Sequence, residues 1–180
     1  MAKVWLEESA HMELSVHDVK KWVGREESFA VAAETLPDLE ARLEAPLRGP
    51  IKAAGRVRNA GSLLLVELEG SVLLQMACAR CGSLADIPVT FSDMAQFREE
   101  RPGPEDDWFA YENETLRLDD WVSDEILLSV PIAPLCRTDC RGLCPQCGAD
   151  WNESACACAP PPDDRWGALA GFRAHGDDAD

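Results

Sequence analysis

The sequence predicts an α+β fold: a β-rich antiparallel meander packed by one main helix, with a C-terminal cysteine-rich module that resembles a zinc ribbon. Two observations carry this prediction. Strand-like segments separated by turn signals follow one another between residues 51 and 91. In the first and the last of them, apolar and polar residues alternate with the period of a half-buried strand. Six of the eight cysteines fall between Cys136 and Cys158, at the short spacings of metal-binding knuckles.

The meander begins at Ile51, from which point every second residue is small or apolar up to Val57. Turn residues at 59–61 separate this strand from the next, predicted at 63–68. Gly70 then separates it from a third strand at 72–78. A fourth strand is predicted at 87–91, and Pro88 indicates an edge position because proline cannot donate to a sheet ladder.

The main helix is predicted at about 119–130. Asp119 and Asp120 are available as caps, and Pro131 ends the helix. One face of it is apolar and is expected to pack on the sheet. This face consists of Leu118, Trp121, Val122, Ile126 and Val130. Weaker signals predict a strand at 12–16, one or two helical turns at 18–23, and a short helix or strand entry at 38–43.

The length of 180 residues favours one domain with a small appendage. We expect a body at 1–135 and a zinc-binding module at 136–158, docked on Cys78 and Cys81. A stiff proline spacer, a short docking helix and a disordered acidic tail are expected at 159–180.

The eight cysteines form four pairs in sequence order. Two cysteines separated by two residues can both bind one tetrahedral ion, at about 2.3 Å from each sulfur. The last two pairs enclose a short loop, so we assign Cys144, Cys147, Cys156 and Cys158 to one local zinc site. The other site then consists of Cys78, Cys81, Cys136 and Cys140, and it clips the middle of the chain to its end. A single zinc site that uses the pairs differently is the alternative.

Other cysteine chemistries are disfavoured. Disulfides need an oxidising compartment, and the first residues carry acids where a secretory signal needs an apolar run. A redox role for Cys78 and Cys81 is disfavoured because the pair ends a strand-like run, whereas a helix N-terminus would depress the pKa of a thiol.

The chain is acidic, with a formal charge of −16. The negative electrostatic field of such a chain repels nucleic-acid phosphates and attracts basic proteins. Direct RNA contact therefore requires a local basic patch. The candidate contact residues are Lys52, Arg56 and Arg58 on one face of the first meander strand, with Arg80 as a fourth member. Alternatively, such arginines partly neutralise thiolate-rich centres and bond to sulfur or to carboxylates.

The sequence contains no convincing candidates for catalytic residues. The three histidines lie near the two ends of the chain, outside any recognisable motif, and four complete cysteine pairs predict closed, structural metal sites. The acidic run at 105–107 is more typical of a solvated loop than of a divalent-metal site. No aliphatic run approaches the ~20 residues that span a bilayer, so we expect a cytoplasmic protein with no membrane partner.

Several motifs occur in a characteristic order. A strand ending in Cys78-Ala79-Arg80-Cys81 is followed by an acidic segment and by the apolar helix that ends at Pro131. Further motifs are Pro134-Leu135-Cys136, Cys140-Arg141-Gly142-Leu143-Cys144-Pro145-Gln146-Cys147-Gly148, Cys156-Ala157-Cys158 and Asp163-Asp164-Arg165-Trp166. From about Ile51 to Leu169 this combination resembles the YceD family, although Asp164 replaces the usual proline and the first 50 residues match only loosely.

The resemblance implies a non-enzymatic bacterial factor that supports the maturation or stability of the large-subunit ribosomal RNA precursor. Some members lack most of the C-terminal cysteines, which implies that the second site is an accessory of the fold. The expected partners are the ribosomal precursor particle and a basic ribosomal protein or RNA-processing factor. A zinc- or thiol-based redox sensor is the alternative function, and a nuclease using the acidic loop is a weaker one.

Overall fold

The structure is a computed structural model that describes residues 8, 9, 11–158 and 165, and all structural statements concern these residues. The architecture is α+β and β-rich, which confirms the predicted class. In chain order its elements are β1 (Glu8–Ser9), β2 (Glu13–Ser15), α1 (His17–Lys20), β3 (Glu26–Ala33), α2 (Leu39–Leu43), β4 (Ile51–Asn59), β5 (Leu64–Ala77), β6 (Leu84–Arg98), β7 (Phe109–Ala110), β8 (Thr115–Arg117) and α3 (Asp119–Ser129). Apart from Arg165, the segment expected to hold the spacer, docking helix and acidic tail lies outside the described residues.

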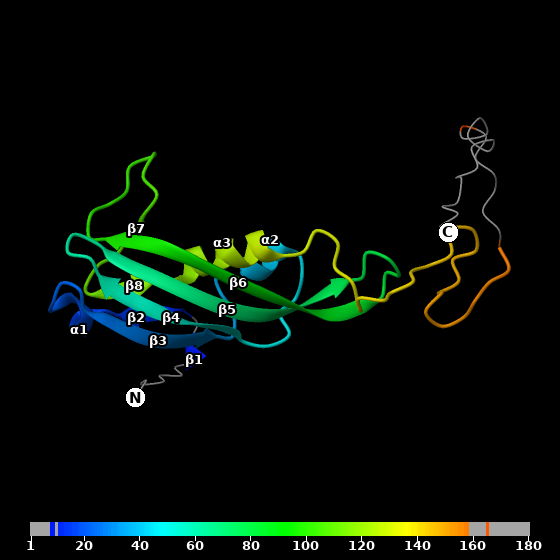
Figure 1. Ribbon diagram of the computed structural model, residues 1–180, viewed down its shortest axis with the longest axis horizontal. Helices are drawn as coiled ribbons and strands as arrows, with labels where there is room; N and C mark the ends of the chain where they lie inside the picture. Colours follow the sequence, from blue (N-terminus) through cyan, green and yellow to red (C-terminus); the bar gives the residue numbers. More distant parts are fainter. Residues whose placement is uncertain (1–7, 10, 159–164, 166–180) are drawn as a thin grey trace, which may run out of the picture.

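The main sheet has the strand order β1-β3-β4-β5-β6-β7. Its four central strands are antiparallel neighbours, whereas the short strands β1 and β7 pair in parallel at the two edges. A separate two-stranded sheet joins β2 to β8. Figure 1 shows α2 and α3 on one side of the main sheet, while β5 and β6 extend past the body as a long hairpin.

The predicted break at Gly70 is wrong, because β5 runs without interruption from Leu64 to Ala77. Gly70 pairs with Phe91 of β6, and a Cβ atom on Gly70 would lie 2.2 Å from the Phe91 ring. The glycine therefore admits an aromatic ring across the strand and does not mark a turn. The predicted edge position of Pro88 agrees with the pairing, because among the described residues the far side of β6 is paired only at Phe97 and Arg98.

Strand β3 was not predicted, although it pairs with β4 along its whole length. Its core-side residues are Phe29, Val31 and Ala33, but the alternate positions Ala30 and Ala32 are apolar too. This composition hides the two-residue period on which strand prediction depends. The predictions at 12–16, 18–23 and 38–43 correspond to β2, α1 and α2, each shorter than its predicted range.

Helix α3 buries the predicted apolar face, with Trp121, Val122 and Ile126 in the core. The Trp121 ring packs at 5.8 Å from the Phe97 ring of β6, measured between ring centroids. The predicted capping is wrong, since no side chain caps this helix. The buried Asp119 carboxylate instead accepts a hydrogen bond of 2.7 Å from the Met12 backbone, which ties the start of α3 to the N-terminal segment.

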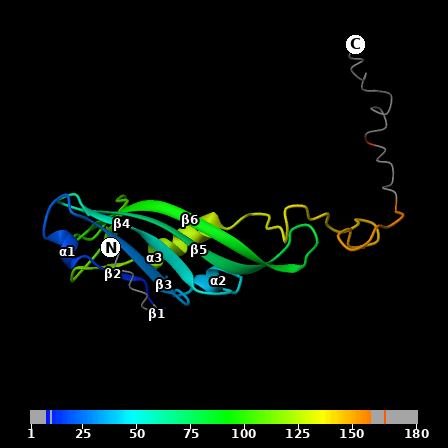
Figure 2. The same cartoon turned by 60° about the horizontal axis from the view of Figure 1, so that its bottom comes forward.

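Beyond α3 the chain runs along the β5–β6 hairpin toward its tip. The Ala79 N–H donates to the Pro134 carbonyl at 2.8 Å, which joins the hairpin loop to the segment after α3. Figures 1 and 2 both place the later part of the cysteine-rich segment, drawn in orange, beyond this tip. Within the described residues, none of the helices has the length and apolar character needed to cross a bilayer.

Candidate metal centres

The eight thiols form two groups of four. We call Cys78, Cys81, Cys136 and Cys140 cluster 1, and Cys144, Cys147, Cys156 and Cys158 cluster 2. Within each cluster all four sulfur atoms lie within 4.8 Å of one another, and all eight cysteines are free of disulfides. These are the two sets that the spacing predicts.

The sulfur separations match a tetrahedral metal site. Four sulfurs at about 2.3 Å from a central ion lie about 3.8 Å apart, whereas a disulfide needs about 2.05 Å. In cluster 1 the Sγ atoms of Cys78 and Cys140 are 3.7 Å apart, as are those of Cys81 and Cys136. The thiols are therefore spaced for a shared ion and not for covalent bonds.

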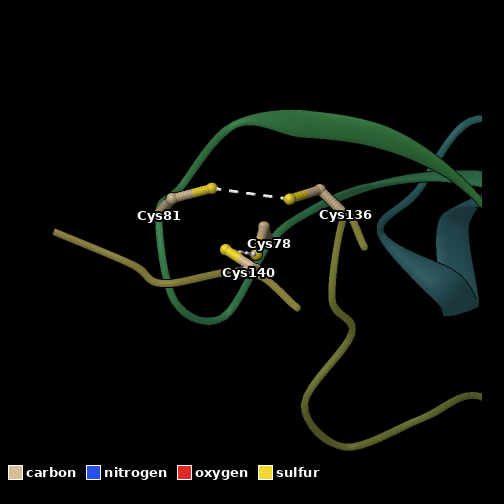
Figure 3. A group of neighbouring side chains, drawn as sticks. All are labelled: Cys78, Cys81, Cys136 and Cys140. Carbon is tan, nitrogen blue, oxygen red and sulfur yellow. Dashed lines mark hydrogen bonds between the residues drawn. The ribbon is translucent and has the colours of Figure 1, made fainter. Parts of the chain in front are cut away.

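Cluster 1 joins two distant parts of the chain. Cys78 and Cys81 come from the loop between β5 and β6, and Cys136 and Cys140 come from the segment after α3. Figure 3 shows their sulfur atoms directed toward one another across the gap between these segments. A metal ion bound here would fasten the C-terminal segment to the tip of the hairpin.

The loop from Cys78 to Ser83 folds as a metal knuckle. The Cys78 N–H donates to the Ser83 carbonyl, and the Gly82 N–H donates to the Cys78 carbonyl, each at 2.8 Å. Gly82 has a φ of +73°, which a glycine adopts at no steric cost. The turn directs the Arg80 N–H toward the Cys78 sulfur, at 3.4 Å.

Cluster 2 contains a second knuckle of the same geometry. The Cys144 N–H donates to the Ala149 carbonyl at 2.8 Å, and the Gly148 N–H donates to the Cys144 carbonyl at 2.9 Å. Gly148 also has a φ of +73°. The Cys-x-x-Cys-Gly pattern therefore produces one local structure twice, independent of its position in the chain.

The four thiols of cluster 1 differ in acidity. Hydrogen bonds from the backbone, chiefly that of Cys136, lower the pKa of Cys78 to about 6. Burial, followed by hydrogen bonding to the neighbouring thiols of Cys140 and Cys81, raises the pKa of Cys136 to about 12. Four sulfurs this close do not all ionise without a compensating cation, which is the chemical requirement that a metal ion meets.

Cluster 2 shows the same division. The Trp151 indole N–H, which donates to the Cys156 sulfur at 3.3 Å, is the main cause that lowers the pKa of Cys156 to about 6. The neighbouring Cys147 thiol raises the pKa of Cys158 to about 12. Cys147 and Cys158 are exposed, whereas no thiol of cluster 1 is. Cluster 2 is thus the more accessible of the two.

The candidate contact residues Lys52, Arg56 and Arg58 do share the exposed face of β4. Arg56 is paired there with two carboxylates, Glu26 at 3.7 Å and Glu67 at 3.2 Å. Lys52 lines a hollow of about 600 Å³ on this face, which also has Glu69 in its wall. Acids therefore offset these cations locally.

Arg80 lies apart from that face. Lys52 pairs with Ser71, and β5 continues to Ala77, so the knuckle begins roughly 20 Å further along the strand. The Arg80 guanidinium instead donates to the Cys140 carbonyl at 2.7 Å. The length of β5, which the prediction divided at Gly70, is the reason for this separation.

Two residues of the metal centres were missed by sequence reasoning, Trp151 and Asn152. Both belong to the loop between the two cysteine pairs of cluster 2. The available signal was the Asp150-Trp151-Asn152 run, because aspartate and asparagine commonly hydrogen-bond to nearby backbone in turns.

The family model described as "Large ribosomal RNA subunit accumulation protein YceD" matches residues 66–173. The chain belongs to the YceD family. The matched region begins inside β5 and contains both thiol clusters, while β3 and β4 precede it.

This YceD-family chain is also similar to mycobacterial proteins. Three of them, one from Mycobacterium bovis and two from strains of Mycobacterium tuberculosis, are each named an uncharacterized protein and are 34% identical to it over 76 residues. The similarity covers 39% of this chain and 37% of each relative, so the chain spans little more than a third of the length of these relatives. No solved structure matches the chain.

Proposed function

We propose that this chain is a non-enzymatic ribosome biogenesis factor that supports the accumulation or processing of large-subunit ribosomal RNA in the bacterial cytoplasm. The observation that carries the proposal is the match of the YceD family model to residues 66–173. The factor is zinc-stabilised and acts through protein contacts.

Zinc is the proposed occupant of both thiol clusters. A donor set of four sulfurs suits zinc, and the 3.7 Å separations in cluster 1 support tetrahedral coordination. With four protein ligands each, the sites have a structural role: cluster 1 fastens a zinc-ribbon-like module at 136–158 to the body at 1–135. Cluster 2 holds the module together.

The charge distribution supports a basic protein as the direct partner, such as a ribosomal protein or an RNA-processing factor in the precursor particle. The formal charge is −16, and each filled four-thiolate zinc site would add two negative charges. Arg56 and Arg58 lie beside the carboxylates of Glu26 and Glu67, and Lys52 shares its hollow with Glu69. These acids weaken the three cations as a phosphate-binding surface.

Depletion of the chain in a bacterium that carries it tests this proposal. We expect precursors of the large-subunit ribosomal RNA to change in amount, and the tagged chain to sediment with large-subunit precursors. A wild-type copy should restore the RNA, and a copy with Arg56→Ala and Arg58→Ala should restore it equally well. Unchanged precursor RNA with no co-sedimentation would remove the proposal.

A second candidate is a zinc- or thiol-based redox-sensing protein, favoured by the exposed thiols of Cys147 and Cys158. In that case mild peroxide should release zinc and change partner binding. Zinc that is retained under peroxide would argue against the sensor.

A further inference from the structure

Two adjacent residues, Trp151 and Asn152, contact different thiol clusters. The Trp151 indole N–H donates to the sulfur of Cys156 in cluster 2. The Asn152 side-chain amide donates to the sulfur of Cys140 in cluster 1, with Nδ2 at 3.5 Å from Sγ. A loop that belongs to the second cluster by sequence therefore supplies a hydrogen bond to the first.

The orientation of the Asn152 amide follows from its other partners. The backbone N–H of Arg141 lies 2.8 Å from Oδ1, and a backbone N–H can only donate. On the other side of the amide, Asp150 Oδ1 lies 2.7 Å from Nδ2 and can only accept. Nδ2 is thus the atom that faces the Cys140 sulfur, and it donates to it.

The same short segment of chain connects both clusters. Cys140 is a ligand candidate of cluster 1, and Cys144, four residues later, is one of cluster 2. Between them Gly142 packs on the first knuckle, where a Cβ atom would lie 3.0 Å from the Arg80 carbonyl oxygen. The Gly142 carbonyl in turn accepts the Trp151 N–H at 3.0 Å, so the loop of cluster 2 rests directly on this segment.

We propose that Asn152 is a positioning residue that couples the two metal sites: a metal ion in cluster 2 orders the turn at 150–152, which holds the Asn152 amide on the Cys140 sulfur and slows metal loss from cluster 1. This inference rests on the proposed metal binding. A hydrogen bond to a ligating sulfur fixes its orientation, and losing such a partner commonly weakens metal affinity about 10- to 100-fold. Because coupling between sites is reciprocal, a filled cluster 1 also favours metal binding at cluster 2.

The test uses the full chain loaded with zinc and measures zinc release into an excess of a chromogenic chelator. We expect two phases, the faster from the exposed cluster 2, which disappears in a Cys147→Ser, Cys158→Ser variant. Asn152→Ala should accelerate the slower phase about tenfold or more. Asn152→Asp should do the same, because it keeps the acceptor for Arg141 and loses the N–H. Glu153→Gln, one residue further on, is the matched control and should release zinc as the wild type does.

A cobalt-loaded sample separates positioning from a general loss of structure. Removing the hydrogen bond should shift the sulfur-to-cobalt charge-transfer band in Asn152→Ala and leave it unshifted in Glu153→Gln. In the Cys147→Ser, Cys158→Ser variant, which lacks cluster 2, zinc release from cluster 1 should already be accelerated. Adding Asn152→Ala to this variant should change that rate little.

The outcomes distinguish this inference from the metal proposal beneath it. A chain that binds neither zinc nor cobalt would overturn both. A chain that binds two ions, with the same slow phase and charge-transfer band in Asn152→Ala as in wild type, would overturn the coupling alone.

Discussion

Replacing Cys81 with serine tests whether cluster 1 is a long-range metal clip. Cys81 and Cys136 are 55 residues apart, and their sulfur atoms lie 3.7 Å apart. Closing a loop of this length removes chain entropy from the unfolded state, worth about 4 kcal/mol on the loop-length relation for crosslinks. The corresponding loop in cluster 2, from Cys147 to Cys156, is short, and its closure is worth only about 2.5 kcal/mol, confined to the module.

Urea unfolding in excess zinc, followed by circular dichroism of the sheet, measures this difference. With a slope of about 2 kcal/mol per molar urea, the midpoint of Cys81→Ser should fall by about 2 M. The urea midpoint of the wild-type chain should fall by a similar amount when a chelator removes its zinc, because the chain then loses the same clip. Cys147→Ser is the matched control and should lower the midpoint of the body by much less, because it leaves all four thiols of the clip in place. Equal shifts in the two variants, or no shift in Cys81→Ser at saturating zinc, would refute the clip.

Two further predictions concern the body. Gly70→Ala should destabilise the sheet by about 1–3 kcal/mol, because its Cβ would meet the Phe91 ring. Urea unfolding should show a smaller loss of stability when Gly70→Ala is made in a Phe91→Leu background. Additive effects of the two substitutions would contradict a clash with the Phe91 ring as the cause. Burial, followed by the neighbouring charges of Asp93 and Asp124, raises the pKa of Glu125. A raised pKa in the folded state favours the protonated carboxyl, so stability from this group is present at low pH and lost as pH rises through that pKa. Glu125→Gln should therefore melt at a higher temperature than wild type at pH 7, and this advantage should shrink as the pH falls through the raised pKa. An advantage that does not vary with pH would exclude the carboxylate as its cause.

The division of the eight cysteines could be predicted because the last two pairs enclose a short loop, which leaves the other two pairs to form the second site. A Cys-x-x-Cys-Gly run forms the same knuckle wherever it lies, as the matching bonds at Gly82 and Gly148 demonstrate. The side chain of Asn152 could not be assigned to Cys140, because that contact depends on how one cluster packs against the other.

The fold was predictable where burial follows a simple period. Strand β4 alternates buried and exposed residues, and α3 buries one face, so both were found. Strand β3 was not predicted because the alanines at 30 and 32 make both of its faces apolar. Strand β5 was predicted as two strands because the sequence alone does not distinguish a glycine that turns the chain from one that admits the Phe91 ring. The separation of Arg80 from Lys52 follows from that uninterrupted strand.

Native mass spectrometry of the full chain, purified with zinc present, tests the central claim most directly. Two zinc ions per chain, with all eight cysteines free of disulfides, is the mass that the two clusters predict. A metal-free chain whose cysteines are joined by S–S bonds, or one that never holds more than a single ion, would contradict the account.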